Sequence, residues 1–144
     1  MTTALWTLVA FAAWTLFVLM FGVGIRRWYL IFSCEAALTS FPGDMAHGSA
    51  AYRRATRAHA NCVENLPVYA AIVLAAQTAR LVPVHMDVLA LAVILCRIAQ
   101  SGIHMLLPET NSTIALRFTF FFAQIIAMIW MMLSMVSLGI GRIS

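Results

Sequence analysis

The feature of this sequence that most limits its fold is a set of long apolar segments. Four segments have the roughly 20 mainly apolar residues that a membrane-crossing helix needs. They run from about Leu5 to Ile25, Cys62 to Leu81, Val88 to Leu107 and Ile114 to Ile140. Lipid offers no hydrogen bonds to an exposed backbone, and the sequence shows no alternating strand pattern, so helices are expected. The chain is predicted to be an all-α integral membrane four-helix bundle.

The low charge of the chain supports this interpretation and leaves almost no room for a domain outside the membrane. Only 10% of the 144 residues are charged, whereas a soluble domain has about 25%. We predict a single membrane domain over residues 1–144, with transmembrane helices at about 4–32, 49–81, 86–107 and 112–140. The first apolar run lacks a basic n-region and exceeds the length of a signal-peptide core, so we expect it to remain as a span.

The arginines predict the orientation of the bundle. The chain has nine arginines and no lysine. Those around the first connection are Arg26, Arg27, Arg53, Arg54 and Arg57, whereas Arg80 and Arg142 fall on the opposite side. The positive-inside rule therefore places the first and third loops in the cytoplasm and both termini outside it. This distribution accounts for the net charge of +4 without a nucleic-acid partner.

Turn and cap signals separate the predicted helices. Residues 33–51 read as a loop with a Pro42-Gly43-Asp44 turn. Asp87 is a plausible N-cap for the third helix, which Pro108 ends, and Asn111 or Ser112 could cap the fourth. The last two connections are short, which favours antiparallel neighbours. The three cysteines follow no metal-ligating pattern, so no metal site is predicted.

Polar residues on the last three predicted helices recur at helical spacing. At roughly 100° per residue, positions three and four apart share a face. The three stripes are Arg53, Arg57, Asn61 and Glu64; Arg97, Gln100, Ser101 and His104; and Arg117 and Gln124. His59 points to nearly the opposite side of its helix. We expect the stripes to face the interior of the bundle.

The stripes hold more positive than negative charge at membrane depth. Arg57, Arg97 and Arg117 face Glu64 alone, and ionisable groups there usually pair because burial costs several kcal/mol. An anionic ligand would supply the missing charge, since a guanidinium suits a carboxylate. The structural alternatives are an Arg57–Glu64 pair, arginines that reach backbone carbonyls or the interface, and polar side chains that bond neighbouring helices. The aromatic run after Arg117 is most simply explained by lipid or core contact.

One motif resembles a known family. Arg57, Ala58, Asn61, Glu64 and Pro67 fill the approximate pattern Arg-Ala-x-x-Asn-x-x-Glu followed by Pro. This is similar to the second-helix signature of the MAPEG family, the membrane-associated proteins in eicosanoid and glutathione metabolism. The length, the four spans, the topology and the Arg26-Arg27 pair that ends the first helix also resemble this family.

The resemblance implies a homotrimer of four-helix subunits, with glutathione as co-substrate bound between adjacent subunits on the cytoplasmic side. It implies that Arg57, Asn61 and Glu64 hold the peptide, with Glu64 near its amino group. Arg117 would be the catalytic residue, because a guanidinium beside the sulfur lowers a thiol pKa from about 8.5 and favours the nucleophilic thiolate. The further glutathione-binding positions would be Arg26, Arg97, Gln100 and His104.

The resemblance therefore implies a membrane-bound glutathione transferase or peroxidase that acts on lipophilic electrophiles. Such a second substrate, a lipophilic small molecule or lipid, could enter from the bilayer. The alternative within the family is a non-catalytic lipid-binding or scaffold protein. A small transporter or channel subunit would also place arginines on interior stripes, but no paired spans are interrupted by Gly or Pro as in repeat-built transporters.

Overall fold

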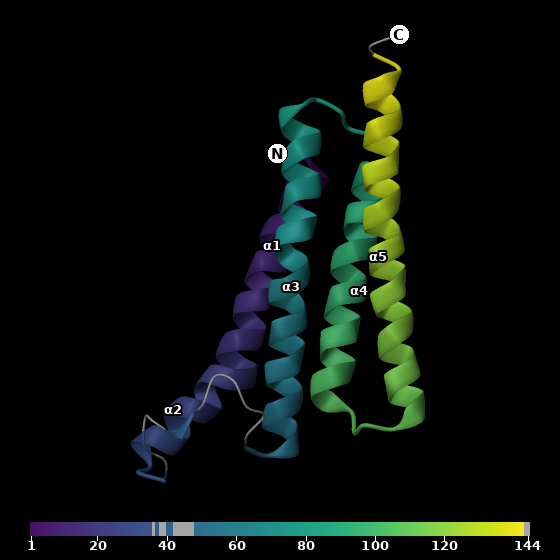
Figure 1. The fold of residues 1–144 in the computed structure, drawn as a ribbon. Coiled ribbons are helices and arrows are strands. Elements are labelled where there is room, and N and C mark those ends of the chain that lie inside the picture. Colours follow the sequence, from purple (N-terminus) through teal and green to yellow (C-terminus); the bar gives the residue numbers. More distant parts are fainter. Residues whose placement is uncertain (36, 38–39, 42–47, 143–144) are drawn as a thin grey trace.

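The computed structural model describes residues 1–35, 37, 40–41 and 48–142, whose regular structure is helical (Figure 1). The elements are α1 (Thr3–Phe17), the π-helix η1 (Val18–Gly24), α2 (Ile25–Phe32), α3 (Ala50–Thr78), α4 (Met86–Leu106) and α5 (Asn111–Ile140). α1, η1 and α2 follow one another without a break. The all-α prediction is confirmed. The predicted Pro42-Gly43-Asp44 turn lies outside the described residues.

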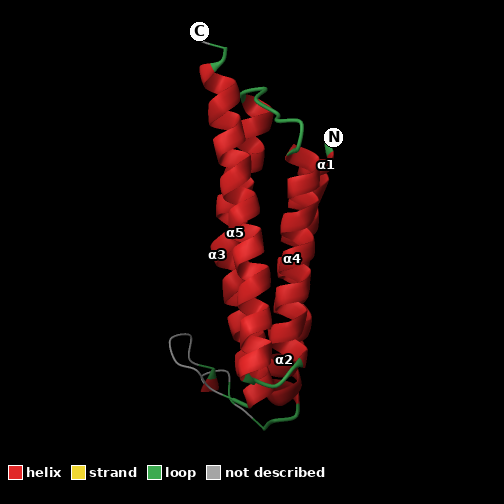
Figure 2. Cartoon of the chain, turned by 90° about the vertical axis from the view of Figure 1, so that its right-hand side faces the viewer, coloured by secondary structure: helices red, strands yellow, loops and turns green. Residues whose placement is uncertain are grey.

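The long helices run up and down the bundle. α3, α4 and α5 lie alongside one another in alternating directions, and α1 packs against α3 and α4 (Figures 1 and 2). The start of α1 and the end of α5 lie at one end of the bundle, and α2 and residues 107–110 lie at the other (Figure 1). The short connections predicted from the sequence therefore join antiparallel neighbours.

Three helical stretches are long and apolar enough to cross a membrane: Thr3–Phe32, Met86–Leu106 and Asn111–Ile140. The fourth predicted span lies in α3, which is not among them. The sequence of α3 explains this difference, since arginines and other polar residues occupy its first half. Length and composition thus support an integral membrane protein through three of the four predicted spans.

The apolar core lies between α1, α3, α4 and α5. Its fully buried members include Phe11, Tyr69, Val73, Val93 and Met131. Helices in lipid associate mainly through close packing and interhelical hydrogen bonds, and this core has both. The Thr7 hydroxyl donates to the Ala4 carbonyl at 2.8 Å and lies 2.6 Å from the Tyr69 hydroxyl.

Two helix caps differ from the prediction, although α4 begins at residue 86 as expected. His85 precedes α4 as its cap residue, and Asp87 lies in the first turn. There the Asp87 carboxylate accepts a hydrogen bond from the Ala4 N–H at 3.0 Å, which ties α1 to α4. Thr110 caps α5 in place of Asn111 or Ser112, because Thr110 and Thr113 satisfy each other's backbone N–H groups in a capping box.

The π-helix η1, which joins α1 to α2, lies close to α3. A Cβ atom at Gly22 would lie 3.1 Å from the Cβ of Ala55, a distance at which one of the two helices would have to shift. Glycine therefore permits this close approach. Tyr52 and Ala55 of α3 pack with Val23 of η1 in a small apolar cluster at this end of the bundle.

Candidate functional site

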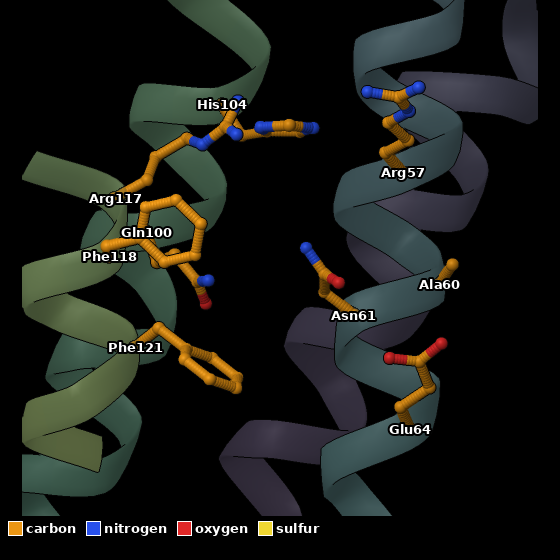
Figure 3. Close-up of a pocket in the computed structure, with 9 residues that line it drawn as sticks. All are labelled: Arg57, Ala60, Asn61, Glu64, Gln100, His104, Arg117, Phe118 and Phe121. Carbon is orange, nitrogen blue, oxygen red and sulfur yellow. The ribbon is translucent and has the colours of Figure 1, made fainter. Parts of the chain in front are cut away.

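A cavity of about 390 Å³ lies between α3, α4 and α5, in the half of the bundle toward α2 (Figure 3). This volume lies within the range of small-molecule sites. The cavity is lined by Arg57, Ala60, Asn61 and Glu64 of α3, Gln100 and His104 of α4, and Arg117, Phe118 and Phe121 of α5. The three polar stripes predicted from the sequence therefore contribute to one space, which we call the central cavity.

The α3 wall follows from helical spacing. Arg57, Asn61 and Glu64 lie four and three residues apart, so they occupy successive turns of one face. Figure 3 shows Arg57, Asn61 and Glu64 at successive levels along α3, with the Asn61 amide directed into the space. This wall offers a cation, an amide and a carboxylate along one line.

The α4 wall consists of two nearly buried polar side chains one turn apart. The amide oxygen of Gln100 accepts a hydrogen bond from the Arg97 Nη1 at 2.7 Å. That bond fixes the amide so that its NH₂ group is the one available to the central cavity. Neither ring nitrogen of His104 has a hydrogen-bond partner among the described residues, although the side chain is only 4% exposed.

Arg97 lies behind this wall and does not line the central cavity. It is 0% exposed, and its guanidinium lies over the Phe11 ring of α1, 5.5 Å from the centroid. Its Nε and Nη2 atoms have no hydrogen-bond partner in the described part of the chain. The predicted ligand-binding arginine thus contacts Gln100, through which it can affect the cavity.

The α5 wall combines a cation with aromatic rings. Arg117 is partly buried and extends toward the His104 ring in Figure 3. Phe118 and Phe121 form the apolar part of the lining. This aromatic run was expected to contact lipid or the core of the bundle. A usable signal was present, because Arg117, Phe121 and Gln124 lie four and three residues apart on one helix face.

Arg26 is the predicted site residue that lies farthest from this arrangement. It is an exposed residue of α2, which extends away from α4 and α5 (Figure 1). It is not among the residues that line the central cavity. The structure of a single chain therefore brings together six of the predicted positions and leaves Arg26 and Arg97 outside the lining.

The central cavity has an excess of positive charge. Two guanidinium groups, Arg57 on α3 and Arg117 on α5, border it together with the single carboxylate of Glu64. Such a site suits a ligand with more negative than positive groups and an apolar part that can lie against the phenylalanine rings.

Comparison with known proteins gives one result that covers almost the whole chain. Residues 3–137 match the model of the MAPEG family, a stretch that includes every residue of the central cavity. No curated protein matches the sequence.

Proposed function

The chain belongs to the MAPEG family, and from this premise we propose that it is a membrane-bound, glutathione-dependent transferase or peroxidase that acts on lipophilic electrophiles. The observation that carries the proposal is the charge pattern of the central cavity. Arg57 and Arg117 border it from different helices, and Glu64 supplies one carboxylate. Glutathione carries two carboxylates, one ammonium group and a thiol, so these residues fit its charges.

Each wall has a role in this proposal. The Arg57 guanidinium would bind a carboxylate of the peptide, and the Glu64 carboxylate would accept from its ammonium group. Asn61 and the NH₂ group of Gln100 would hydrogen-bond the peptide backbone. The unpartnered ring nitrogens of His104 would gain a partner, which relieves the cost of leaving buried polar atoms unsatisfied.

Arg117 would be the catalytic residue. Bound glutathione supplies a nucleophilic sulfur, and a positive charge beside it favours the thiolate over the thiol. Phe118 and Phe121 would exclude water and accept an apolar second substrate from the lipid. Placement of the cavity end on the cytoplasmic side, as the arginine distribution predicts, would give the site access to soluble glutathione.

The proposed assembly is a homotrimer. Arg57 and Glu64 are exposed in the single chain, which suits a site that a neighbouring subunit completes. Because α2 extends away from the central cavity of its own chain, Arg26 would contribute to the site of another subunit.

A non-catalytic lipid-binding role is the second candidate. The observation that favours it is the aromatic side of the central cavity, where Phe118 is 52% exposed. An acyl chain could lie against Phe118 and Phe121 without any chemistry at Arg117.

The thiolate of bound glutathione distinguishes these two functions. We expect the purified protein to show thiolate ultraviolet absorbance near neutral pH and turnover with a general electrophile. Arg117→Ala should abolish the absorbance and lower turnover by about 10²–10³-fold, as loss of a group that stabilises developing charge does. Arg142→Ala is the matched control, because Arg142 is an exposed arginine at the opposite end of the bundle.

Both variants should keep the elution volume of the wild-type protein, so that a loss of signal reports the site and not the assembly. Wild-type protein with neither thiolate absorbance nor turnover would reject the enzyme proposal and leave lipid binding as the better explanation.

A further inference from the structure

A second cavity, of about 430 Å³, lies beside the start of α3. It is lined by Ala50, Arg53, Arg54, Arg57, Pro108 and Glu109, and we call it the arginine cavity. Pro108 and Glu109 belong to the α4–α5 connection, so this space lies at the end of the bundle that also holds α2 (Figure 1). Arg57 borders both cavities, but the other residues of the arginine cavity take no part in the proposed glutathione site.

The arginine cavity has a large excess of positive charge. Three guanidinium groups face one carboxylate, that of Glu109. Arg53 is held in place, since its Nη1 donates to the Gly48 carbonyl at 2.8 Å. The Nε of Arg54 is buried and has no hydrogen-bond partner in the described ranges. Within the described residues, the cavity thus contains a buried guanidinium donor, the Nε of Arg54, that no protein group satisfies.

The chemistry of these donors points to phosphate. A guanidinium presents a planar fork that matches the oxygens of a phosphate group, and several such forks can bind one phosphate together. Arg53 also lies in the first turn of α3, where the helix dipole favours an anion. The other wall, Pro108 and Glu109, adds no positive charge to the described lining.

The exposed aromatic residues at the same end of the bundle favour a lipid as the source of that phosphate. Trp28 and Tyr29 of α2 are exposed at the same end of the bundle, and Trp and Tyr side chains are typical of the headgroup level. Arginines near an anionic membrane surface attract its lipids by about 1 kcal/mol each. The cavity would therefore meet phospholipid headgroups directly.

We propose that the arginine cavity binds a phosphate group, carried by an anionic phospholipid or by a soluble phosphate ester. The site holds the phosphate between Arg53, Arg54 and Arg57. Glu109 opposes this binding and limits its strength. The proposal does not depend on glutathione binding or on catalysis.

Native mass spectrometry of the full chain in a nonionic detergent tests the lipid source. We expect wild-type protein to retain dioleoyl phosphatidic acid in preference to dioleoyl phosphatidylcholine. The double variant Arg53→Gln with Arg54→Gln should weaken retention of phosphatidic acid by about tenfold or more. Glu109→Gln should strengthen it, because that change removes the opposing charge.

Calorimetric titration with glycerol 3-phosphate tests the soluble source. Binding that the double variant loses would identify a soluble phosphate ester as a ligand, whereas retention of phosphatidic acid alone would identify the lipid. Arg142→Gln is the control in both arms, since it removes an exposed arginine at the opposite end of the bundle. Circular dichroism and elution volume check that each variant is folded.

Two results would overturn the proposal. One is that the double variant binds both probes as tightly as wild-type protein does. The other is that Arg142→Gln weakens phosphatidic acid retention as much as the double variant does, because the attraction would then depend on net charge and not on this cavity.

Discussion

The two halves of the bundle differ in how some of their buried polar groups are used, although each half has buried polar atoms without a partner among the described residues, Trp14 and Gln77 being examples near the termini. In the half near the termini, Tyr69 and Thr7 are hydrogen-bonded to each other, and the Asp87 carboxylate accepts from a backbone N–H. In the half toward α2, both ring nitrogens of His104 and both amide atoms of Gln124 have no partner among the described residues. Near the termini, the bonds of Tyr69 and Asp87 join helices, whereas in the other half His104 leaves two unpartnered nitrogens on the wall of the central cavity.

This difference distinguishes buried polar groups that stabilise the fold from buried polar groups that are available to a ligand. An unsatisfied buried donor or acceptor costs about 1–3 kcal/mol, so an isolated bundle would be more stable with apolar residues at such positions. A ligand in the central cavity could supply the partner that His104 lacks. The contrast therefore predicts that changes in the half near the termini alter stability, and that changes around the cavity alter binding.

The largest loss of stability should follow from truncation of a core side chain in the half near the termini. Met131→Ala removes a fully buried side chain of α5, and a cavity left by such a change costs about 2–5 kcal/mol. We expect a marked fall in the temperature of unfolding in detergent. Below that temperature, the glutathione thiolate absorbance should remain that of wild-type protein. A selective loss of the absorbance in a folded variant would contradict the separation of the two halves.

Much of the central cavity could be predicted from the sequence because a helix is a regular object. Asn61 and Glu64 lie three residues apart, and so do Arg97 and Gln100, which fixes each stripe on one face before any packing is known. An excess of arginine within otherwise apolar segments then indicates which faces turn inward. The same regularity could have identified Phe121, which shares the face of Arg117.

The sequence could not show that Gln100 lines the central cavity and that Arg97 does not, since both residues belong to one stripe. A stripe covers a broad arc, and the rotation of α4 against α1 decides which member reaches the cavity. Phe11 of α1 receives the guanidinium of Arg97, and nothing in the sequence pairs these two residues. The position of Arg26 likewise depends on the direction of α2 beyond the π-helix. That direction is set by the packing of the helices against one another and cannot be obtained from the sequence pattern.

A change of intermediate size, in ligand affinity, is expected for Arg97, which lies at the border between the two halves. Arg97→Met replaces a buried cation that has two unpartnered nitrogens by an apolar side chain, which can rest on the Phe11 ring. The change removes two unpartnered buried nitrogens but leaves the Gln100 oxygen without its donor, and these two effects oppose each other, so the unfolding temperature should change little. Gln100 loses the donor that orients its amide, and glutathione affinity should fall about tenfold, equivalent to 1.4 kcal/mol.

A double-mutant cycle identifies the route of this effect. If Arg97 acts through Gln100, the variant that carries both Arg97→Met and Gln100→Met should bind glutathione no more weakly than Gln100→Met alone. Fully additive losses would mean that Arg97 affects the ligand by another path, such as its charge.

The smallest effect should come from Tyr69→Phe in the half near the termini. The Thr7 hydroxyl already gives its proton to the Ala4 carbonyl, so the Tyr69 hydroxyl is the donor in the bond that joins α3 to α1. Without it, Thr7 keeps its bond to Ala4, and no buried donor is left unpaired. Interhelical hydrogen bonds in membranes contribute about 0.6 kcal/mol on average. We therefore expect a small fall in unfolding temperature and unchanged glutathione affinity.

Thr7→Val should lower the unfolding temperature more, because it leaves the Tyr69 hydroxyl without a hydrogen-bond partner in the apolar core. Equal losses in the two variants would show that the hydroxyl of Tyr69 finds another partner, and that the half near the termini is less tightly specified than its hydrogen bonds indicate.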